Sequence, residues 1–221
     1  MENKNSKNAI CTIAEVTKRH RSSTLLGPLS FSLFRGEILG LQGANGAGKS
    51  TLLKTIAGLY RPTSGRIQFD SNEPLQIGYV PQDIALYMEL SGRENLRFWA
   101  GVYGLSKQQY EIRIPWLLKA VNLEEKAEQL LQTYSGGMCR RLNLAVALLK
   151  TPAILLLDEP TVGADYESVE TILNLMKDLK SREVSIIFVS HQEEELRKVS
   201  DRILTLADGK IQSISERSQW L

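Results

Sequence analysis

The sequence predicts an α/β fold in which a mainly parallel central sheet is joined by an antiparallel β subdomain and an inserted α-helical lobe. Continuous apolar runs at 153–157 and 184–189 indicate strands that are covered on both faces, as in a parallel sheet. Segments 10–16 and 29–34 alternate in polarity or are rich in β-forming residues, which is typical of antiparallel strands. The stretch 84–150 shows helical spacing instead, so it interrupts the strand-forming sequence.

A glycine-rich loop follows the first predicted parallel strand, 37–41, and matches the phosphate-binding pattern G-x-x-x-x-G-K-[ST]. It consists of Gly43, Ala44, Asn45, Gly46, Ala47, Gly48, Lys49, Ser50 and Thr51. Glycines let successive backbone N–H groups close around an anion, and the helix that follows adds its own free amides. The order of strand, loop and helix therefore predicts a P-loop NTPase core.

Three side chains at the end of this loop have distinct roles in such a core. Lys49 is expected to reach the β- and γ-phosphates of a nucleotide as a point charge. The Ser50 hydroxyl is expected to ligate Mg²⁺, and Thr51 to donate to the α-phosphate. We therefore expect the bound species to be a nucleoside triphosphate with Mg²⁺.

The segments between this loop and the lobe continue the fold. Apolar residues in 52–57 share one face of a helix, and 58–65 is rich in turn-forming residues. Residues 66–70 predict a third antiparallel strand. Residues 76–80 predict a short strand that ends at Pro81-Gln82.

Two capping boxes mark helices of the lobe. Ser91 with Glu94, and Ser106 with Gln109, each open a run rich in Leu, Phe, Trp and Tyr at helical spacing. Pro115 lies within the second run, so we expect it to kink or end that helix.

Beyond the lobe and the first buried strand, apolar residues between 169 and 179 predict an amphipathic helix. The second buried strand follows at 184–189. Asp208-Gly209, between segments 203–206 and 211–214, predicts a hairpin. The chain is thus expected to be a single domain, 1–221. Its RecA-like core, with the antiparallel β part, is assigned to 1–83 and 151–221, and its helical lobe to 84–150.

Two acidic residues, Asp158 and Glu159, end the buried strand that follows the lobe. Strand ends in a P-loop fold point at the phosphate loop, so Asp158 is expected to hold Mg²⁺ through water. Glu159 is expected to orient or deprotonate the attacking water. Ser135-Gly136-Gly137 opens another helix and offers a second set of backbone amides for a phosphate, although the motif fits an ordinary helix start equally well.

Composition excludes several classes of protein. The 221 residues carry a formal charge of +2, which gives no sign of a nucleic-acid surface. Cys11 and Cys139 are isolated, which suits a reducing compartment. The polar start lacks the core of a signal peptide, and no apolar run approaches the ~20 residues that span a bilayer. We expect a cytoplasmic protein that reaches a membrane only through a partner.

These motifs occur in an order that resembles the ATP-binding subunits of ABC transporters. The matching segments are Gly43 to Ser50, Pro81-Gln82, Tyr134 to Met138, Ile154 to Pro160, Thr161 to Asp165 and Ser190-His191. The similarity extends from about Ile10 to Ile214. The Tyr-Ser-Gly-Gly-Met form of the signature is most similar to bacterial exporter ATPases of the daunorubicin-resistance type.

The resemblance implies an ATPase that binds ATP and Mg²⁺ and dimerises head to tail, as a homodimer or with a related subunit. Each ATP would lie between the P-loop of one subunit and the signature, Ser135-Gly136-Gly137, of the other. The resemblance further implies that Gln82 links Mg²⁺ and water to the helical lobe, and that Asp165 lies at the dimer seam. His191 would touch the γ-phosphate. We expect Lys49, Gln82, Glu159 and His191 to be the catalytic set.

A subunit of this kind powers transport, here export, through a separate integral membrane permease at the inner face of the cell membrane. A non-transport ABC ATPase is one alternative, and an ATP-dependent switch without turnover is another. The presence of both Glu159 and His191 argues against the switch. The resemblance does not name the cargo, because specificity in this family lies in the permease, and it leaves import open as an alternative to export.

The sequence departs from the family pattern at two positions. His20 aligns where an aromatic residue usually stacks on adenine, and its smaller ring should stack less strongly. Cys139 stands where a basic residue or Gln is common. Residues 88–96, just after Gln82, are expected either to form part of a docking groove for helices of the permease or to pack internally.

Overall fold

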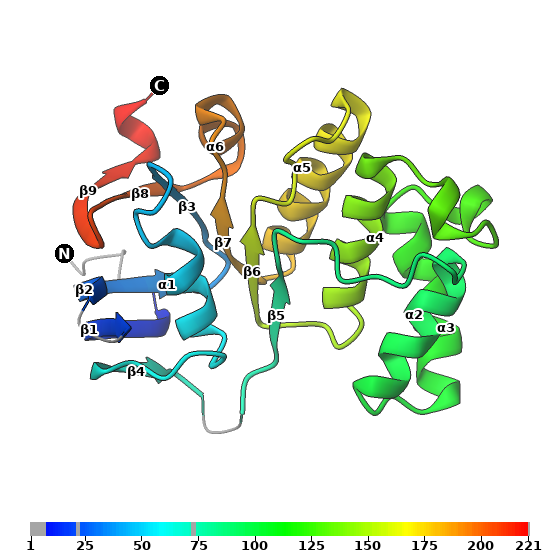
Figure 1. The fold of residues 1–221 in the computed structure, drawn as a ribbon, viewed down its shortest axis with the longest axis horizontal. Helices are drawn as coiled ribbons and strands as arrows, with labels where there is room; N and C mark the ends of the chain where they lie inside the picture. Colours follow the sequence, from blue (N-terminus) through cyan, green and yellow to red (C-terminus); the bar gives the residue numbers. More distant parts are fainter. Residues whose placement is uncertain (1–7, 21–22, 72–73, 221) are drawn as a thin grey trace, which may run out of the picture.

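The computed structural model describes residues 8–20, 23–71 and 74–220, and this part of the chain forms two sheets flanked by helices (Figure 1). The strands are β1 (Ala9–His20), β2 (Ser23–Phe34), β3 (Ile38–Gly43), β4 (Ser64–Phe69), β5 (Ile77–Val80), β6 (Ile154–Asp158), β7 (Ser185–Val189), β8 (Arg202–Ala207) and β9 (Lys210–Glu216). The α-helices are α1 (Lys49–Ile56), α2 (Gly92–Val102), α3 (Lys107–Ala120), α4 (Gly136–Ala147), α5 (Tyr166–Ser181) and α6 (Glu193–Val199). Short 3-10 turns lie at Glu124–Lys126, Leu131–Thr133 and Arg217–Gln219. This arrangement confirms the predicted α/β fold class.

The larger sheet has the strand order β5-β6-β7-β3-β8-β9, and the smaller one is an antiparallel sheet of order β2-β1-β4. In the larger sheet the strands from β5 to β8 run parallel, and only β9 is antiparallel to its neighbour. Every residue of β6 and β7 is buried, which explains their continuous apolar sequences. Because parallel strands end at the same edge, the segments that follow β3, β5, β6 and β7 meet there.

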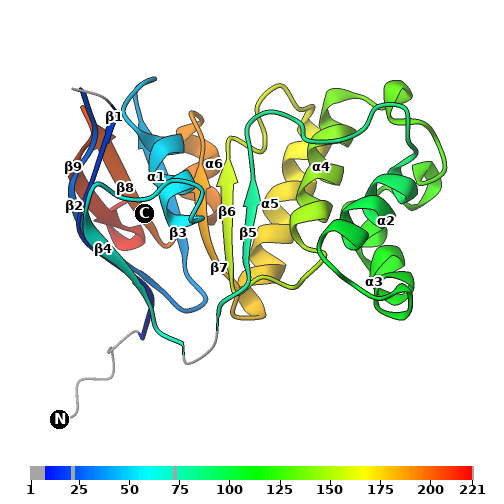
Figure 2. The same ribbon diagram turned by 60° about the horizontal axis from the view of Figure 1, so that its bottom comes forward.

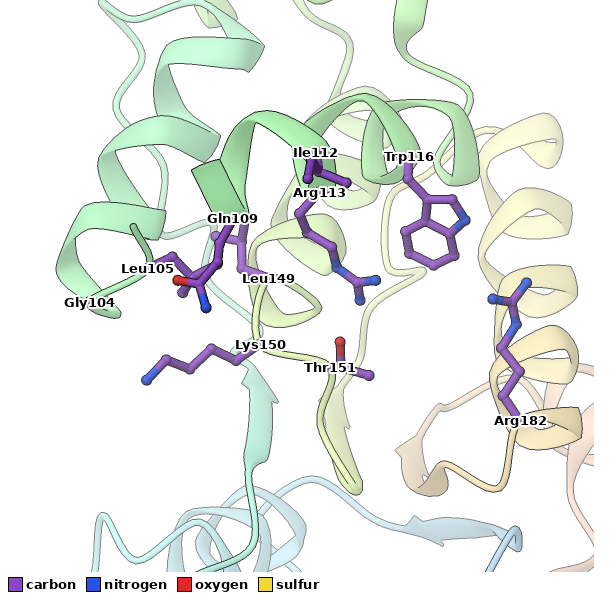
Figure 3. A pocket seen from close by; sticks show the side chains of 10 residues that line it. All are labelled: Gly104, Leu105, Gln109, Ile112, Arg113, Trp116, Leu149, Lys150, Thr151 and Arg182. Carbon is purple, nitrogen blue, oxygen red and sulfur yellow. The ribbon is translucent and has the colours of Figure 1, made fainter. Parts of the chain in front are cut away.

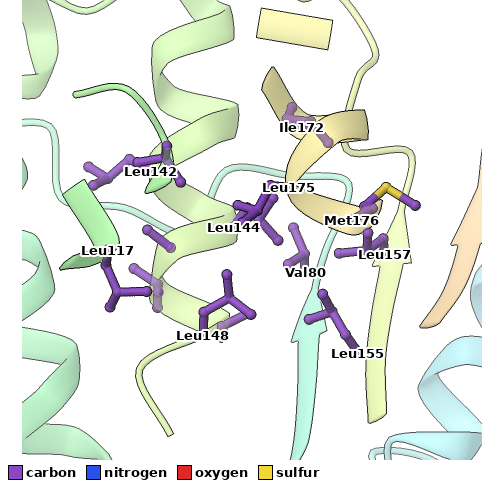
Figure 4. Close-up of a cluster of buried hydrophobic side chains, with 14 of the residues drawn as sticks. Val80, Leu117, Leu142, Leu144, Leu148, Leu155, Leu157, Ile172, Leu175 and Met176 are labelled. Atoms are coloured by element: carbon purple, nitrogen blue, oxygen red, sulfur yellow. The ribbon is translucent and has the colours of Figure 1, made fainter. Parts of the chain in front are cut away.

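Alternate residues of the parallel strands face two separate cores. Leu155 and Leu157 of β6 contact a cluster that includes residues of α4, α5 and α6 (Figure 4). Ile154 and Leu156 contact a second cluster, formed with α1 and the antiparallel sheet. In both ribbon views α1 accordingly lies on one side of β6, and α4 and α5 lie on the other (Figures 1 and 2). The P-loop helix and the signature helix are therefore separated by the sheet.

The helices α2 and α3 begin at the predicted caps. Ser91 and Ser106 each accept a hydrogen bond from the backbone N–H three residues later, and Glu94 and Gln109 complete the two capping boxes. Such reciprocal bonds satisfy amides that have no partner inside the helix. These two helix starts could be predicted because both members of each pair are close in sequence.

Of the two effects expected of Pro115, a kink or an end of the helix, the second is wrong, because α3 continues through Pro115 to Ala120. A proline inside a helix removes one backbone hydrogen bond and costs about 3 kcal/mol or more. Pro115 is exposed, whereas Ile114, Leu117 and Leu118 are buried in the helical core. Each fully buried side chain of this size contributes roughly 1.5–3 kcal/mol, so the packing of three outweighs the lost bond.

Candidate nucleotide-binding site

The glycine-rich loop joins β3 to α1 and lies closely beneath β2. Gly48 is the N-cap of α1 and has φ 99°, in the left-handed region. A Cβ atom at this position would lie 2.5 Å from Leu26 Cδ2 and 2.9 Å from Leu25 O. The β8–β9 turn also contacts the loop, because the Gly209 N–H donates to Ala47 O (3.2 Å). Only glycine fits at position 48, and both β2 and the β8–β9 turn hold the loop in shape.

Lys49 is folded back over this loop. Its Nζ donates to Gly43 O (2.7 Å) and to Ala44 O (3.2 Å). Burial lowers the pKa of Lys49, and the nearby carboxylates of Glu159 and Asp158 act in the opposite direction. A buried ammonium that is poorly solvated favours a close anion. The loop thus presents a positive charge beside the free amides of a helix N-terminus, as a phosphate requires.

Asp158, at the end of β6, is the buried carboxylate of the site. The Ser50 hydroxyl donates to its Oδ1 (3.1 Å), and the Tyr79 hydroxyl donates to its Oδ2 (3.4 Å). Desolvation raises the pKa of Asp158, and Glu159 adds to this effect, while the bonds from Ser50 and Tyr79 and the charge of Lys54 lower it. The sequence did not predict a role for Tyr79 in this site, because its contact with Asp158 joins two different strands.

A hydroxyl and a carboxylate in contact are oxygen donors of the kind that Mg²⁺ prefers. The described residues contain no group of three or more His, Cys, Asp or Glu side chains that could hold a metal by themselves. Mg²⁺ is usually bound by one or two protein oxygen ligands and completed by substrate phosphates and water. Ser50 and Asp158 therefore fit Mg²⁺ that arrives with a nucleotide.

Glu159 lies between two other predicted catalytic residues. Its Oε2 accepts a hydrogen bond from Gln82 Nε2 (3.1 Å), and its Oε1 lies 2.8 Å from His191 Nε2. Since a carboxylate only accepts, the ring nitrogen is the donor in this bond. Glu159 also has φ 52°, which is uncommon for a non-glycine residue and is often found at functional sites. Three segments distant in sequence thus converge on one carboxylate.

These residues enclose a cavity of about 560 Å³ at the carboxyl edge of the parallel strands. Its described lining comprises Leu25, Asn45, Gly46, Gly48, Lys49, Ser50, Thr51, Gln82, Glu159 and His191. The predicted P-loop and catalytic residues are therefore brought together, and Gly43 and Ala47 belong to the same loop but are not among the described lining residues. The side chain of His20, which we expected beside adenine, lies outside the described residues. Leu25 of β2 lines the cavity and was not predicted.

The signature residues do not share this cavity. Ser135 is the N-cap of α4, where its side chain accepts from Met138 N (3.2 Å). Ser135 and Gly136 are exposed, whereas Gly137 is buried against the start of α5. A Cβ atom on Gly137 would lie 2.4 Å from Ser168 Oγ and 2.6 Å from Asp165 Oδ2. Asp165 therefore lies beside Gly137 of its own chain, and both lie away from Lys49.

A partly buried hydrogen-bond network supports the loops that carry Glu159 and His191. Glu195 Oε2 accepts from Thr161 Oγ1 (2.7 Å) and from Ser190 Oγ (2.8 Å). Glu195 belongs to α6, a helix that we did not predict. Acidic residues in its first turn and basic residues in its last turn match the helix dipole and could have revealed it.

A second connection joins the signature helix to the segment after β5. Arg140 Nη1 of α4 donates to the backbone carbonyl of Gln82, whose side chain contacts Glu159. A displacement of α4 would therefore act directly on Gln82. Sequence spacing gave no sign of this contact, because 58 positions separate the two residues.

Comparison with known proteins agrees with this geometry. The family profile described as "ABC transporter" matches residues 26–162. The linearmycin resistance ATP-binding protein LnrL of Bacillus subtilis (strain 168) is 39% identical over 211 residues, covering 92% of this chain and 68% of the relative. The SkfA peptide export ATP-binding protein SkfE of the same organism is 33% identical and covers 94% and 92% of the two chains. The Nod factor export ATP-binding protein I of Bradyrhizobium diazoefficiens is 36% identical and covers 93% and 70%.

Solved structures show the same fold. An ATP-binding subunit of an ABC transporter superposes with a TM-score of 0.84 at 29% identity, covering 96% of this chain and 93% of that chain. A dimeric, post-hydrolysis structure of the ATP-binding cassette MJ0796 with ADP and Pi gives a TM-score of 0.83 at 28% identity, with coverages of 94% and 98%.

Proposed function

Because the chain belongs to the ABC transporter family, we propose that the residues around Glu159 hydrolyse ATP and that this hydrolysis drives export through a separate membrane permease. The chain is an ATP-binding subunit and an ATPase of this family. Relatives whose names state antibiotic resistance, peptide export or Nod factor export support the direction of transport. The proposal specifies neither the exported molecule nor the permease.

One observation carries the catalytic proposal. Glu159 is the residue after the buried Asp158, and its two carboxylate oxygens contact Gln82 and His191. A carboxylate held in this way is oriented and can accept a proton from water at the phosphate. Gln82 and His191 fix its direction, and His191 can donate to the γ-phosphate once it leaves Glu159.

The binding steps follow from the other side chains. Lys49 exchanges the Gly43 and Ala44 carbonyls for the β- and γ-phosphates, so that its charge is better compensated. Ser50 and Asp158 would hold Mg²⁺, with the amide oxygen of Gln82 as a further ligand, and the ion would neutralise charge on the phosphates. Thr51 donates to the α-phosphate.

The location of the signature supports a site completed by a second subunit. Ser135 and Gly136 are exposed, and α4 lies across the sheet from α1. Within one chain they therefore do not reach the phosphate that Lys49 holds. We assign them to the ATP of a partner subunit, in a head-to-tail homodimer or heterodimer with Asp165 near the seam.

The segment expected to dock on a permease has two different parts. Asn95 and Leu96 are fully buried, so the end of the segment packs internally. Met88, at the start of the segment, is 41% exposed, and Tyr87 and Phe98, which flank the segment, are 44% and 41% exposed with their rings 4.6 Å apart. Within the described ranges, no helix has the length and apolar character needed to cross a membrane. We assign docking to these three exposed side chains, at the inner face of the membrane.

The measurement of phosphate release from Mg-ATP tests the proposed function, using the protein with its co-purified membrane subunit. We expect turnover in the wild type and none in Lys49→Ala, which removes the charge at the β- and γ-phosphates. Lys210→Ala, an exposed lysine on β9, is the matched control. An ATP-dependent switch would instead bind ATP without releasing phosphate, and that result in the wild type would overturn the proposal.

A further inference from the structure

A second cavity, of about 790 Å³, lies between the helical lobe and the core (Figure 3). Its walls include Gln109, Arg113 and Trp116 of α3, residues 149–151 after α4, and Arg182, which caps the end of α5. This lining shares no residue with the nucleotide cavity. The cavity is large enough for a ligand with several polar groups.

The charges of the cavity are unbalanced. Arg113, Lys150 and Arg182 contribute three cations, whereas none of the described lining residues is Asp or Glu. Arg182 forms an ion pair with Asp178 at 3.0 Å, but both side chains are about half exposed. Within the described ranges, neither Arg113 nor Lys150 has a carboxylate at ion-pair distance. An anion in this cavity would therefore meet uncompensated positive charge.

Arg113 is the central cation. Its guanidinium lies 4.4 Å from the centre of the Trp116 ring, and that of Arg182 lies 5.3 Å from the same ring. The Arg113 Nη2 donates to Leu148 O (2.8 Å), while its Nε is buried without a hydrogen-bond partner in the described structure. Burial lowers the pKa of Arg113, and the charge of Arg182 lowers it further. Two guanidinium groups are thus held near one ring, at an electrostatic cost.

Polar groups face the same space. Figure 3 shows the Arg113 guanidinium directed towards the Thr151 hydroxyl, whereas the Lys150 side chain extends away from both, towards the end of the cavity where Gln109 lies. Arginine binds phosphate through two parallel N–H groups, and lysine adds a point charge. Trp116 already has a cation near its ring, so an aromatic ligand would have to displace a guanidinium. The arrangement fits a compact phosphate group better than a planar base.

We propose that this cavity binds a phosphate group through Arg113 and Arg182, with the Lys150 side chain turning towards the bound anion. The phosphate compensates the repulsion between the two guanidinium groups and links α3 of the lobe to the end of α5 in the core. The same chemistry is carried by a soluble phosphate compound and by the headgroup of an anionic phospholipid. The proposal does not depend on ATP hydrolysis.

NMR titration of the full chain with inorganic phosphate tests binding at this site. The indole N–H of Trp116 and the Nε–H of Arg113 report on the cavity, and the amides of the P-loop report separately on the nucleotide site. Sodium chloride at equal ionic strength is the control titration. We expect saturable shifts of the Trp116 and Arg113 signals with phosphate only.

The double variant Lys150→Gln with Arg182→Gln should weaken phosphate binding by at least about tenfold, because two charge-assisted contacts are lost. Both side chains are exposed, so the fold should be retained, which circular dichroism can check. Lys119→Gln on α3 removes the same charge outside the cavity lining and should leave the affinity unchanged. Equal phosphate affinity in the double variant would overturn the proposal, and shifts in phosphate no greater than in chloride would exclude a soluble phosphate compound as the ligand.

Co-sedimentation with vesicles distinguishes the two sources of phosphate. Phosphatidylglycerol vesicles are compared with phosphatidylcholine vesicles, again with the double variant and Lys119→Gln. Binding to phosphatidylglycerol that only the double variant loses identifies a lipid headgroup. Saturable binding of inorganic phosphate without vesicle binding identifies a soluble phosphate compound. Absence of both interactions contradicts the proposal.

Discussion

The carboxylate of Glu159 and the imidazole of His191 are hydrogen bonded, with Oε1 and Nε2 2.8 Å apart. They lie at the ends of neighbouring parallel strands, β6 and β7, and are separated by 32 positions in sequence. The sheet therefore brings the proposed general base together with the side chain that we propose orients it. Gln82, from the end of β5, holds the second oxygen of the same carboxylate.

Replacing Glu159 by Gln should leave ATP binding intact and reduce hydrolysis by about 10²- to 10⁴-fold, because the amide keeps the shape but cannot accept the proton. The ATP-bound protein should then accumulate as a dimer. Phosphate release and size-exclusion chromatography with Mg-ATP measure the two effects. Glu193→Gln, at the exposed start of α6, is the control. Retained turnover, or only monomer with ATP bound, would contradict this prediction.

Glu195→Ala should lower kcat while leaving the affinity for ATP unchanged. The substitution removes the acceptor shared by Thr161 and Ser190, so the loops that carry Glu159 and His191 lose their common support. A displacement of about 1 Å at reacting groups can cost on the order of 10²-fold in rate. Steady-state kinetics should show partial rescue by Glu195→Gln, which keeps an acceptor oxygen, and no effect of Glu194→Ala. A change in ATP affinity alone would argue against a positioning role.

Asp158→Asn should stabilise the nucleotide-free protein at neutral pH. We expect its free energy of unfolding to rise by about 0.5–2 kcal/mol, the range typical of single stabilising substitutions. Burial raises the pKa of Asp158, so the folded state binds this proton more readily than the unfolded chain. As pH rises from the ordinary pKa of 3.8 through the raised pKa of the folded state, the buried carboxyl group becomes charged. The free energy of unfolding of the wild type therefore falls over this range. The neutral amide removes this loss.

Urea unfolding without Mg²⁺ or nucleotide measures this effect across the acidic range. The advantage of Asp158→Asn should shrink as pH falls, because the wild-type carboxyl becomes protonated in the folded state. Asp208→Asn, in the exposed β8–β9 turn, should show no such trend. An Asn variant that is less stable at neutral pH would mean that the bonds from Ser50 and Tyr79 outweigh desolvation.

Sequence patterns predicted those features whose cause is local or follows from strand order. The capping boxes at Ser91 and Ser106 depend on residues three positions apart. The convergence of Lys49, Asp158 and Glu159 follows from parallel strands that end at one edge. The continuous apolar strands also needed no information from distant segments.

Features that depend on contacts between distant segments were not predicted. Tyr79 contacts Asp158, Glu195 joins two loops, and Arg140 donates to the backbone of Gln82. None of these contacts corresponds to a recognisable residue spacing in the sequence. Pro115 was misjudged for a related reason, since the packing that keeps α3 intact comes from other helices.

Selectivity between purine bases should be weak. Leu25 lines the cavity and offers no polar side-chain group to read a base, and the ring of His20 is smaller than that of Tyr. GTP should therefore bind within about tenfold of ATP, or ~1.4 kcal/mol. Calorimetry should show tighter ATP binding in His20→Tyr, and no change would mean that the adenine stacks elsewhere. A GTP affinity far below that of ATP would show that another group recognises the base.

The final prediction concerns whether two subunits share each ATP. Lys49→Ala disables the P-loop and leaves the signature intact, whereas an aspartate in the signature repels the γ-phosphate and leaves the P-loop intact. Gly136 is the better position for that aspartate. A Cβ atom there meets only Gly163 O at 3.7 Å, whereas one on Gly137 would collide with Ser168 and Asp165 of its own chain. Gly136→Asp should therefore change the charge without disturbing α5.

A heterodimer of Lys49→Ala with Gly136→Asp has one intact site and one doubly defective site if each ATP lies between subunits. If each ATP is handled within one chain, both sites carry one defect and neither works. We expect single-turnover cleavage of labelled ATP in the purified, doubly tagged heterodimer and in neither mutant homodimer. Pairing must be verified by the two tags. Verified pairing without cleavage would mean that the two sites act only together or that Ser135 and Gly136 do not complete the partner's site.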